Sequence, residues 1–215
     1  NGQQELLQLI SGEQRLAEKF PVQILGEQAG RLNARQRRQL GMAFVPEDRL
    51  GRGAVPGMGL ADNAILTGAS NLALALVARG FVQGKKAREF ADECIASFDV
   101  RGGGAGAPAK SLSGGNLQKY IVGREIMQSP KLLVVAQPTW GVDVGAAAAI
   151  RQAIVDLRNR GCAVLVISEE LEELFEMCDR IAVLAKGRLS PVRPASEATI
   201  EDIGLWMSGL WPGAE

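Results

Sequence analysis

The fold is decided by residues 131–187, KLLVVAQPTWGVDVGAAAAIRQAIVDLRNRGCAVLVISEELEELFEMCDRIAVLAKG. Short apolar runs at 132–135 and 163–167 predict two buried strands. The segment between them, 146–160, has the length and composition of a helix, which Gly161 ends. Strand, helix and strand at this spacing predict a right-handed βαβ unit and a parallel sheet covered on both faces.

The alternation continues toward the C-terminus. A helix is expected at 170–177, and a third strand at 181–184 that turns at Lys186 and Gly187. In sheets of this kind, ligands gather at the carboxyl ends of the strands. Polar residues that directly follow the apolar runs are therefore candidate site residues.

Upstream of these elements, SLSGGNLQK at 111–119 joins a glycine-rich loop to the helical run YIVGREIMQ. Two adjacent glycines leave the backbone N–H groups of a helix start uncovered. Together with the Ser113 hydroxyl they form a cradle for phosphate oxygens. Ser-Gly-Gly on its own is more often an ordinary loop with a helix cap.

The sequence pattern changes between residues 51 and 110. LADNAILTGASNLALALVARG (60–80) and KKAREFADECIASF (85–98) have helical spacing with no strand between them, and GGGAGAPA (102–109) follows. This pattern predicts an inserted helical subdomain with a flexible exit. An amphipathic membrane-surface helix at 69–80 is the alternative, but packing is favoured because the flanking basic face of such helices is missing.

The first 50 residues contain the helix and strand boundary signals of an α/β protein, with helices and strands in alternation. In chain order the expected elements are a helix opening at 5–10, a strand at 22–25, a polar helix capped by Asn33 and ending at Leu40, and a strand at 42–45.

Composition excludes several classes of protein. With 47% hydrophobic residues in 215, the chain is long enough for a buried core. The 24 basic residues balance 24 acidic ones without a basic block, so no nucleic-acid partner is expected. Every apolar run is shorter than the ~18 residues of a membrane helix. The chain opens on NGQQELL without Met or a signal segment, as a fragment of a longer protein would.

Cysteine and histidine usage argues against a metal site. Cys94, Cys162 and Cys178 stand at wide, unpatterned spacing and the chain has no His. This fits neither a disulfide framework nor a Cys/His metal site, and a reducing, cytosolic setting is the simplest interpretation. No mechanism here can use imidazole as acid, base or ligand.

Several motifs together resemble one family across nearly the whole chain. LSGGNLQK resembles the signature motif of ABC ATPases, and KLLVVAQPTWGVDVGA stands where that family has its Walker B strand and D-loop. NGQQELL resembles the tail of a degenerate phosphate loop, FVPEDRLGRG the Q-loop region, and VLVISEELEELFEMCDRIAVL the strand, switch region and following strand. VPEDR, AQPTWGVD and EATIEDIGLWMSG are similar to the C-terminal ATP-binding domain of importers for simple sugars and, more closely, nucleosides.

The resemblance implies a fold and a domain organisation. It implies an α/β, P-loop NTPase-like core with a parallel sheet, formed by 1–50 and 111–215 and truncated at its N-terminus within the phosphate loop. A helical signature subdomain is expected at 51–110. The strand that precedes the phosphate loop in the family would lie upstream of residue 1, so we expect either further chain upstream or a sheet in which that slot is refilled.

Carried over residue by residue, the resemblance also implies a degenerate site. Aligned on Gly2, the phosphate-loop Lys and Ser/Thr positions are Gln3 and Gln4, which bring no charge. The Walker B Asp and Glu are replaced by Ala136 and Gln137, which cannot hold Mg²⁺ or take a proton at neutral pH.

Three further positions depart from the family or are ambiguous. The switch His is Glu169, whose charge would repel phosphate, and the Q-loop Gln is Glu47. Glu47 is otherwise a solvated turn charge. Asp143 matches the D-loop Asp that faces the opposing domain, although it is also the expected cap of the next helix.

The resemblance therefore implies a division of labour. In this family two ATP-binding domains pair head to tail, and each ATP lies between the phosphate loop of one and the signature of the other. This chain retains the signature motif, whereas its phosphate loop and Walker B strand are degenerate. Its expected contribution to an ATP held with Mg²⁺ by the partner is Leu112, Ser113, Gly114, Gly115, Asn116 and Gln118.

The expected partners are the N-terminal ATP-binding domain of the same subunit, permease subunits and, indirectly, a substrate-binding protein. The expected location is the cytoplasmic face of the membrane, as a peripheral subunit, and the domain alone is expected to be inactive. Two alternatives remain at this stage: a self-sufficient homodimeric ATPase, and a soluble ABC-type ATPase acting on ribosomes or DNA.

Overall fold

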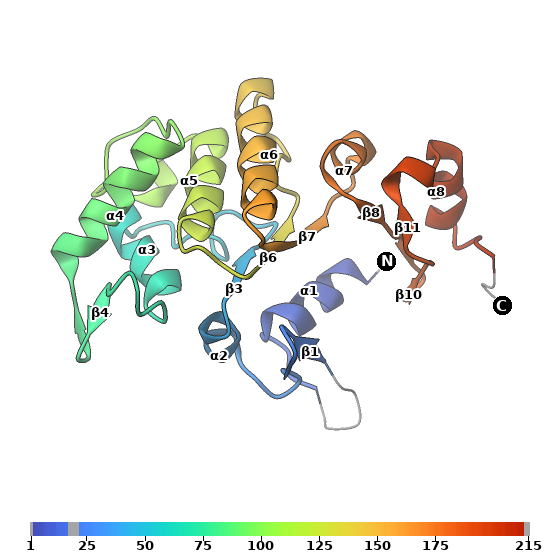
Figure 1. The fold of residues 1–215 in the computed structure, drawn as a ribbon. Coiled ribbons are helices and arrows are strands. Elements are labelled where there is room, and N and C mark those ends of the chain that lie inside the picture. The colour runs from blue at the N-terminus through green and yellow to red at the C-terminus, as the bar shows by residue number, and fades with distance from the viewer. Residues whose placement is uncertain (1, 17–21, 213–215) are drawn as a thin grey trace.

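The central element is a three-stranded parallel sheet (Figure 1). The computed structural model describes residues 2–16 and 22–212. The sheet has the order β3 (Met42–Val45), β6 (Leu132–Ala136), β7 (Ala163–Ile167), with β6 in the middle. Both pairings are parallel. The strands expected at 42–45, 132–135 and 163–167 are thus confirmed, as is the α/β fold with a parallel sheet.

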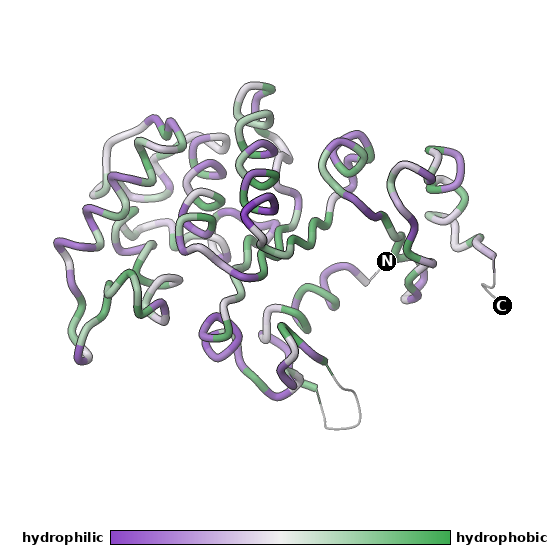
Figure 2. The backbone as a smooth tube through the Cα atoms, in the orientation of Figure 1, coloured by the Kyte–Doolittle hydropathy of each residue, from purple (hydrophilic) through white to green (hydrophobic). Residues whose placement is uncertain are grey.

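The two faces of the sheet pack against different layers. Ala43, Val45, Leu133 and Val135 lie in one core cluster with residues of α5 (Gly114–Ile126) and α6 (Val144–Asn159). The alternate residues Met42, Phe44, Val134 and Ala136 lie in a second cluster with Leu7 of α1 (Gln3–Ser11) and Ile24. Because strand side chains alternate between faces, the continuous apolar runs fill both layers. Figure 2 shows these hydrophobic strands between more polar helices.

β7 is less buried than expected. All five of its residues are exposed or half-buried, and Leu165 keeps 38% of its surface exposed. Within the described residues β7 pairs with β6 on one side only, but β3 at the other edge does so too and all four of its residues are buried. Edge position alone therefore does not account for the exposure of β7. No described strand pairs with the outer edge of β7 or of β3, so a refilled slot is not seen in the described part of the sheet.

The N-terminal segment adds small elements to the second face. β1 (Gln23–Ile24) and β2 (Glu27–Gln28) form an antiparallel hairpin, shorter than the strand expected at 22–25. α2 (Ala34–Gln39) begins at the expected cap, and Asn33 and Gln36 bond reciprocally in a capping box. Such a cap satisfies two of the N–H groups that a helix start leaves unpaired.

The prediction of helices without a strand at 60–98 is wrong. α3 (Leu60–Gly68) is followed by a hairpin of β4 (Val77–Ala78) and β5 (Phe81–Val82), and only then by α4 (Gly84–Ser97). Arg79 and Gly80 both have positive φ, as a two-residue type I′ turn requires.

A tertiary contact explains the end of α3. A Cβ on Gly68 would lie 2.8 Å from Leu76 Cδ1, so the returning chain packs Leu76 directly on Gly68. Leu76 is 1% exposed whereas Leu72 is 90% exposed. The repeated leucines of 72–76 therefore do not form the continuous apolar helix face that their spacing predicts.

The glycine-rich loop at 102–109, expected to be a flexible exit, is docked in its second half. The backbone N–H groups of Leu60 and Ala61 donate to the carbonyls of Ala107 and Ala105, at 3.1 and 2.9 Å. These bonds satisfy two of the unpaired N–H groups at the start of α3. The loop thereby ties α3 to the segment that leads into α5.

The C-terminal segment differs from the expected third parallel strand at 181–184. β8 (Arg180–Ile181) pairs antiparallel with β11 (Arg193–Pro194), and β9 (Leu184–Ala185) pairs with β10 (Arg188–Leu189) around the expected turn at Lys186 and Gly187. The expected strand is split because its two halves find separate partners downstream. α7 (Leu171–Met177), the short helix Ala195–Glu197 and α8 (Ile200–Met207) complete this part.

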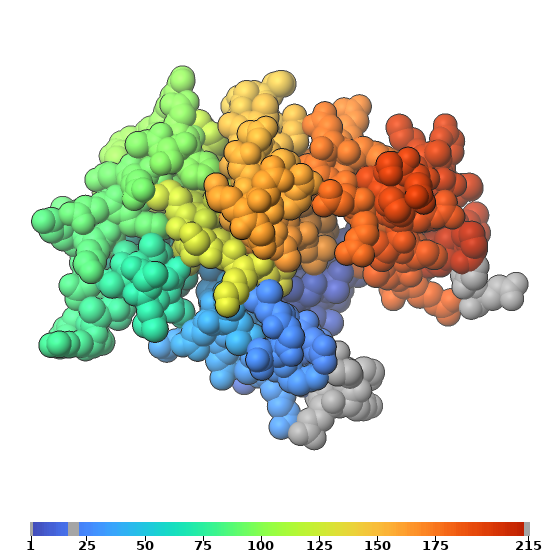
Figure 3. All heavy atoms as spheres, in the orientation of Figure 1, coloured from blue at the N-terminus to red at the C-terminus, as the bar shows by residue number. Residues whose placement is uncertain are grey.

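Figure 3 shows the C-terminal segment as a lobe at one end of the molecule, with α3 and α4 at the other. This lobe has its own small core, in which Ile203 and Trp206 of α8 pack on Ile181. No helix in the described part of the chain has the length and hydropathy that a membrane crossing needs.

Candidate functional site

The start of α5 has the geometry of an anion cradle. Ser113 is the N-cap, and its Oγ accepts from the backbone N–H of Asn116 at 3.4 Å and from Asn116 Nδ2 at 2.9 Å. Gly114 and Gly115 follow, exposed and half-buried, and no described acceptor takes their N–H groups. Leu112 is buried beneath the cap, after the short helix Ala109–Ser111.

Two other residues of the motif anchor this helix start. Asn116 Oδ1 accepts the N–H of Arg101 at 2.8 Å. Gln118 is 1% exposed, and its Nε2 donates to the carbonyl of Pro138 at 2.9 Å. The helix start is therefore fixed to the loop that follows β6.

Asp143 also lies at this place. It is the N-cap of α6, where its Oδ1 accepts the N–H of Ala146 at 2.9 Å. Its Oδ2 would be 3.4 Å from a Cβ on Gly115. The interpretation as a helix cap is confirmed, and the structure brings Asp143 to the motif at 113–118. Its contact with an opposing domain stays a prediction.

A second group of predicted residues meets at the carboxyl ends of β6 and β7. Ala136 ends β6 and is 1% exposed. Gln137 follows with φ +47°, a conformation that non-glycine residues rarely adopt. Its N–H donates to the carbonyl of Ile167 at 2.8 Å, and its Oε1 accepts the N–H of Glu169 at 3.3 Å.

This edge does not fit a Mg²⁺ ion, because that ion prefers carboxylate oxygens in octahedral geometry. The Ala136 methyl offers no ligand, and the amide oxygen of Gln137 already accepts a backbone bond. Within the described residues no three Cys, Asp or Glu side chains gather where they could hold a metal. Glu169 is exposed and adds only a single carboxylate.

The start of α1 brings no positive charge. Gly2 is the N-cap with φ +102° and makes no side-chain cap bond. Gln3 is half-buried and Gln4 is exposed, and the one charge of the first turn is the acidic Glu5. Gly2 lies beside Leu184 of β9, whose Cδ2 would be 3.7 Å from a Cβ added to Gly2.

Glu47 is exposed in the loop that follows β3, behind the buried Pro46. No described residue bonds its carboxylate. The exposure fits a solvated turn charge, and a role at a Q-loop stays a prediction.

Sequence reasoning missed Arg49, two residues further along. Its Nε donates to Gln118 Oε1 at 3.1 Å, and its Nη1 would be 2.8 Å from a Cβ on Gly114. Partial burial lowers the pKa of Arg49. The motif VPEDR contained this residue, but nothing in its spacing indicated a contact 69 residues away.

A buried contact between Thr139 and Glu173 was missed as well. Thr139 Oγ1 donates to Glu173 Oε1 at 2.6 Å, and Glu173 is 2% exposed. Its Oε2 has no partner among the described residues. The contact ties the loop after β6 to α7.

Buried charges join the helical layer to the loop after β3. Glu125 is fully buried and pairs with Arg38 at 2.6 Å and Arg124 at 3.0 Å. Arg124 also donates to the carbonyl of Gly53 at 2.9 Å. Burial alone would raise the pKa of Glu125, but the two guanidinium groups outweigh it and lower the pKa below its usual value.

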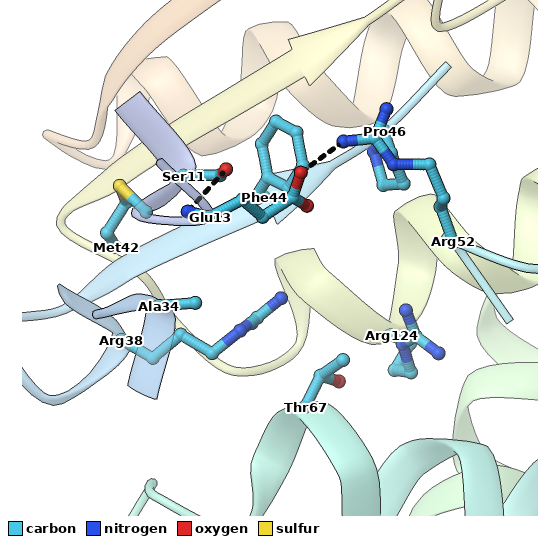
Figure 4. Close-up of a pocket in the computed structure, with 10 residues that line it drawn as sticks. All are labelled: Ser11, Glu13, Ala34, Arg38, Met42, Phe44, Pro46, Arg52, Thr67 and Arg124. Carbon is cyan, nitrogen blue, oxygen red and sulfur yellow. Dashed lines mark hydrogen bonds and ion pairs between the residues drawn. The ribbon is translucent and has the colours of Figure 1, made fainter. Parts of the chain in front are cut away.

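Arg38 and Arg124 line a cavity of about 130 Å³, drawn in Figure 4. Arg52 also lines the cavity and pairs with Glu13 at 2.6 Å. Each arginine that lines the cavity thus pairs with a carboxylate of the chain itself, Arg38 and Arg124 sharing Glu125, and the cavity is too small for a nucleotide.

Comparisons with known proteins give close relatives by sequence, although no family model matches. The chain is 37% identical over 212 residues to guanosine import ATP-binding protein NupO of Bacillus subtilis, covering 97% of this chain and 40% of that protein. It is 37% identical to nucleoside import ATP-binding protein NupA of Lactococcus lactis, with 97% and 41% covered, and 36% identical to ribose import ATP-binding protein RbsA 2 of Rubrobacter xylanophilus, with 97% and 39%.

Solved structures agree on the fold. A dimeric bacterial ABC transporter cassette matches with a TM-score of 0.72 at 21% identity, covering 90% of this chain and 81% of that one. The chain spans about 40% of the length of the curated relatives it matches. These relatives are named for import, not for ribosomes or DNA, so the alternative of a soluble ATPase without a permease is not favoured.

Proposed function

Because the chain belongs to the import ATP-binding proteins, which have the ATP-binding cassette fold, we propose that it is the second, degenerate ATP-binding half of an importer subunit. In this proposal it completes the ATP site of its partner domain and does not hydrolyse ATP by itself. Nucleosides or simple sugars are the proposed cargo, in line with the printed names of its relatives.

The observation that carries the proposal is the open start of α5. The N–H groups of Gly114 and Gly115 and the Ser113 cap offer donors to an anion without an acceptor of the chain in the way. A helix start of this kind attracts phosphate oxygens through its unpaired N–H groups and its dipole. We assign Leu112, Ser113, Gly114, Gly115, Asn116, Gln118 and Asp143 to the contact with the partner's nucleotide.

The opposite half of the site supports inactivity. Catalysis of phosphoryl transfer depends on charges that hold Mg²⁺ and on a group that orients water. Gln3, Ala136 and Gln137 supply neither, and Glu169 adds a negative charge. Loss of one acid–base group costs on the order of 10² to 10⁴ in rate. Several such losses leave the domain alone without useful hydrolysis.

The organisation follows from the same proposal. Residues 1–50 and 111–215 form the ATPase core, and 51–110 the helical signature subdomain. The partners are an N-terminal ATP-binding domain in the same subunit, which holds ATP and Mg²⁺, and permease subunits, with a substrate-binding protein acting indirectly. The subunit is then peripheral, on the cytoplasmic face of the membrane.

The test uses the complete subunit, assembled with its permease in liposomes. Ser113→Arg places a long side chain in the cradle and is expected to reduce transport-coupled ATPase to background. Gln3→Ala, at the degenerate phosphate loop, is expected to change the rate by less than about threefold, since it removes no charge. Equal damage from both variants contradicts the division of labour.

A further inference from the structure

The guanidinium of Arg49 lies against two glycines. Its Nη1 would be 2.8 Å from a Cβ on Gly114, at the start of α5, and its Nη2 3.7 Å from a Cβ on Gly141, in the loop between β6 and α6. A side chain at 114 would therefore displace the guanidinium. The absence of a Cβ lets a cation stand beside the open N–H groups of the helix.

Among the described residues, Arg49 is held in this place by a hydrogen bond from one of its nitrogens. Its Nε donates to Gln118 Oε1 at 3.1 Å, and Gln118 is in turn fixed by its bond to the carbonyl of Pro138. A guanidinium has five N–H donors, and four of them are on the two Nη atoms. These four donors have no acceptor among the described residues, so the end of the side chain is fixed in position while its N–H groups are available to a ligand.

The charge of Arg49 is also unpaired in the described part of the chain. Asp143, the acidic residue nearest to the glycines, is engaged as the cap of α6. Lys119, the cation of the motif itself, and Arg101 share the carboxylate of Asp99. Among the described residues, Arg49 is thus the cation beside Gly114 whose charge has no carboxylate partner. Its side chain is half-buried, whereas Gln118 is 1% exposed.

We propose that Arg49 contacts the terminal phosphate of the ATP that the partner domain presents to the start of α5. The inference rests on the function proposed above and adds a residue to it. Backbone N–H groups fix the position of a phosphate, and a guanidinium supplies two parallel charged donors to its oxygens. The side chain would then distinguish ATP from ADP, because only ATP carries the phosphate that reaches the cradle.

The experiment measures equilibrium binding of ATPγS and of ADP to the complete subunit assembled with its permease. Arg49→Met and Arg49→Gln remove the charge, and Arg49→Lys keeps it without the planar fork. Loss of a charged hydrogen bond is expected to weaken ATPγS binding by about 10- to 100-fold. ADP binding should change by less than about twofold, and Arg49→Lys should fall between the wild type and Arg49→Met.

The matched control is Arg88→Met, which removes the same charge from an exposed position on α4 and should leave both affinities unchanged. Thermal melting shows whether Arg49→Met and Arg49→Gln fold, and binding is measured on the variant that does. If ATPγS and ADP weaken equally, or if neither changes, while Ser113→Arg still abolishes ATPase, Arg49 is not a phosphate contact. If Ser113→Arg itself leaves ATPase intact, the proposed function has failed, whatever Arg49 does.

Discussion

Replacing Glu125 by Gln should be among the most destabilising conservative changes in this protein. Glu125 is fully buried between Arg38, whose side chain is 17% exposed, and Arg124, which is 2% exposed. The amide has nearly the same size, so no cavity forms. It leaves the Arg124 guanidinium buried without a counter-charge and directs an N–H₂ group toward one of the two arginines. Removing one partner from a buried ion pair costs about 3–5 kcal/mol.

The assay is urea unfolding followed by circular dichroism and tryptophan fluorescence at pH 7. With a urea m-value on the order of 2–3 kcal/mol/M, the expected loss lowers the midpoint by about 1–2.5 M. The m-value itself should stay unchanged. Glu93→Gln is the matched control, because Glu93 is an exposed residue of α4. A surface change of this kind is worth less than about 0.5 kcal/mol.

The pH dependence gives a second check. The folded pKa of Glu125 lies below its ordinary value of 4.5, so the folded state binds fewer protons than the unfolded state between the two pKa values. The stabilisation is therefore complete at pH 7, begins to fall below about pH 4.5, and is lost as the pH passes the folded pKa. The wild type and Glu125→Gln should converge over this window. A loss below about 1 kcal/mol at pH 7, or a difference that is independent of pH, would show that the charge of Glu125 does not stabilise the fold.

Three further changes test other parts of the structure. An added methyl in Gly123→Ala would lie 2.5 Å from Phe98 Cδ2, and the displaced ring should cost about 1–3 kcal/mol, seen as a lower melting temperature; an unchanged melting temperature would mean that the ring moves freely. Burial raises the pKa of the Cys94 thiol to about 12, so Ellman's reagent at pH 8 should leave Cys94 unlabelled in the folded protein and label it in urea; rapid labelling without urea would contradict its burial. Asn33→Ala removes the capping box with Gln36 and should cost about 1 kcal/mol in urea unfolding, whereas Asn33→Asp should retain most of it.

Local features were predictable because they depend on neighbours in the chain. The caps at Asn33 and Asp143 bond to N–H groups three residues ahead, and the turn at Lys186 and Gly187 needs only two residues that tolerate positive φ. The apolar runs of β3, β6 and β7 were also readable, since strands between two packed layers are apolar at every position. These signals established the α/β class and the open start of α5.

Pairing between distant segments was not predictable in the same way. The strand expected at 181–184 divided because β11, at Arg193–Pro194, captured its first half. The helix expected to continue past Gly68 ended because Leu76 folds back onto that glycine. In both places the local sequence pattern is compatible with several structures. The structure that forms depends on a tertiary contact with a segment further along the chain.

The candidate site divides along the same line. The amino-acid sequence is enough to establish which groups are present, since residue type alone decides what can carry charge. These groups are the serine, the two glycines and the asparagine of the motif, and the uncharged Gln3, Ala136 and Gln137. The position of Arg49 beside Gly114 and the hydrogen bond from Thr139 to Glu173 are visible only in the folded chain. These partners are 65 and 34 positions apart, and the chain holds them together through hydrogen bonds and packing that no local spacing encodes.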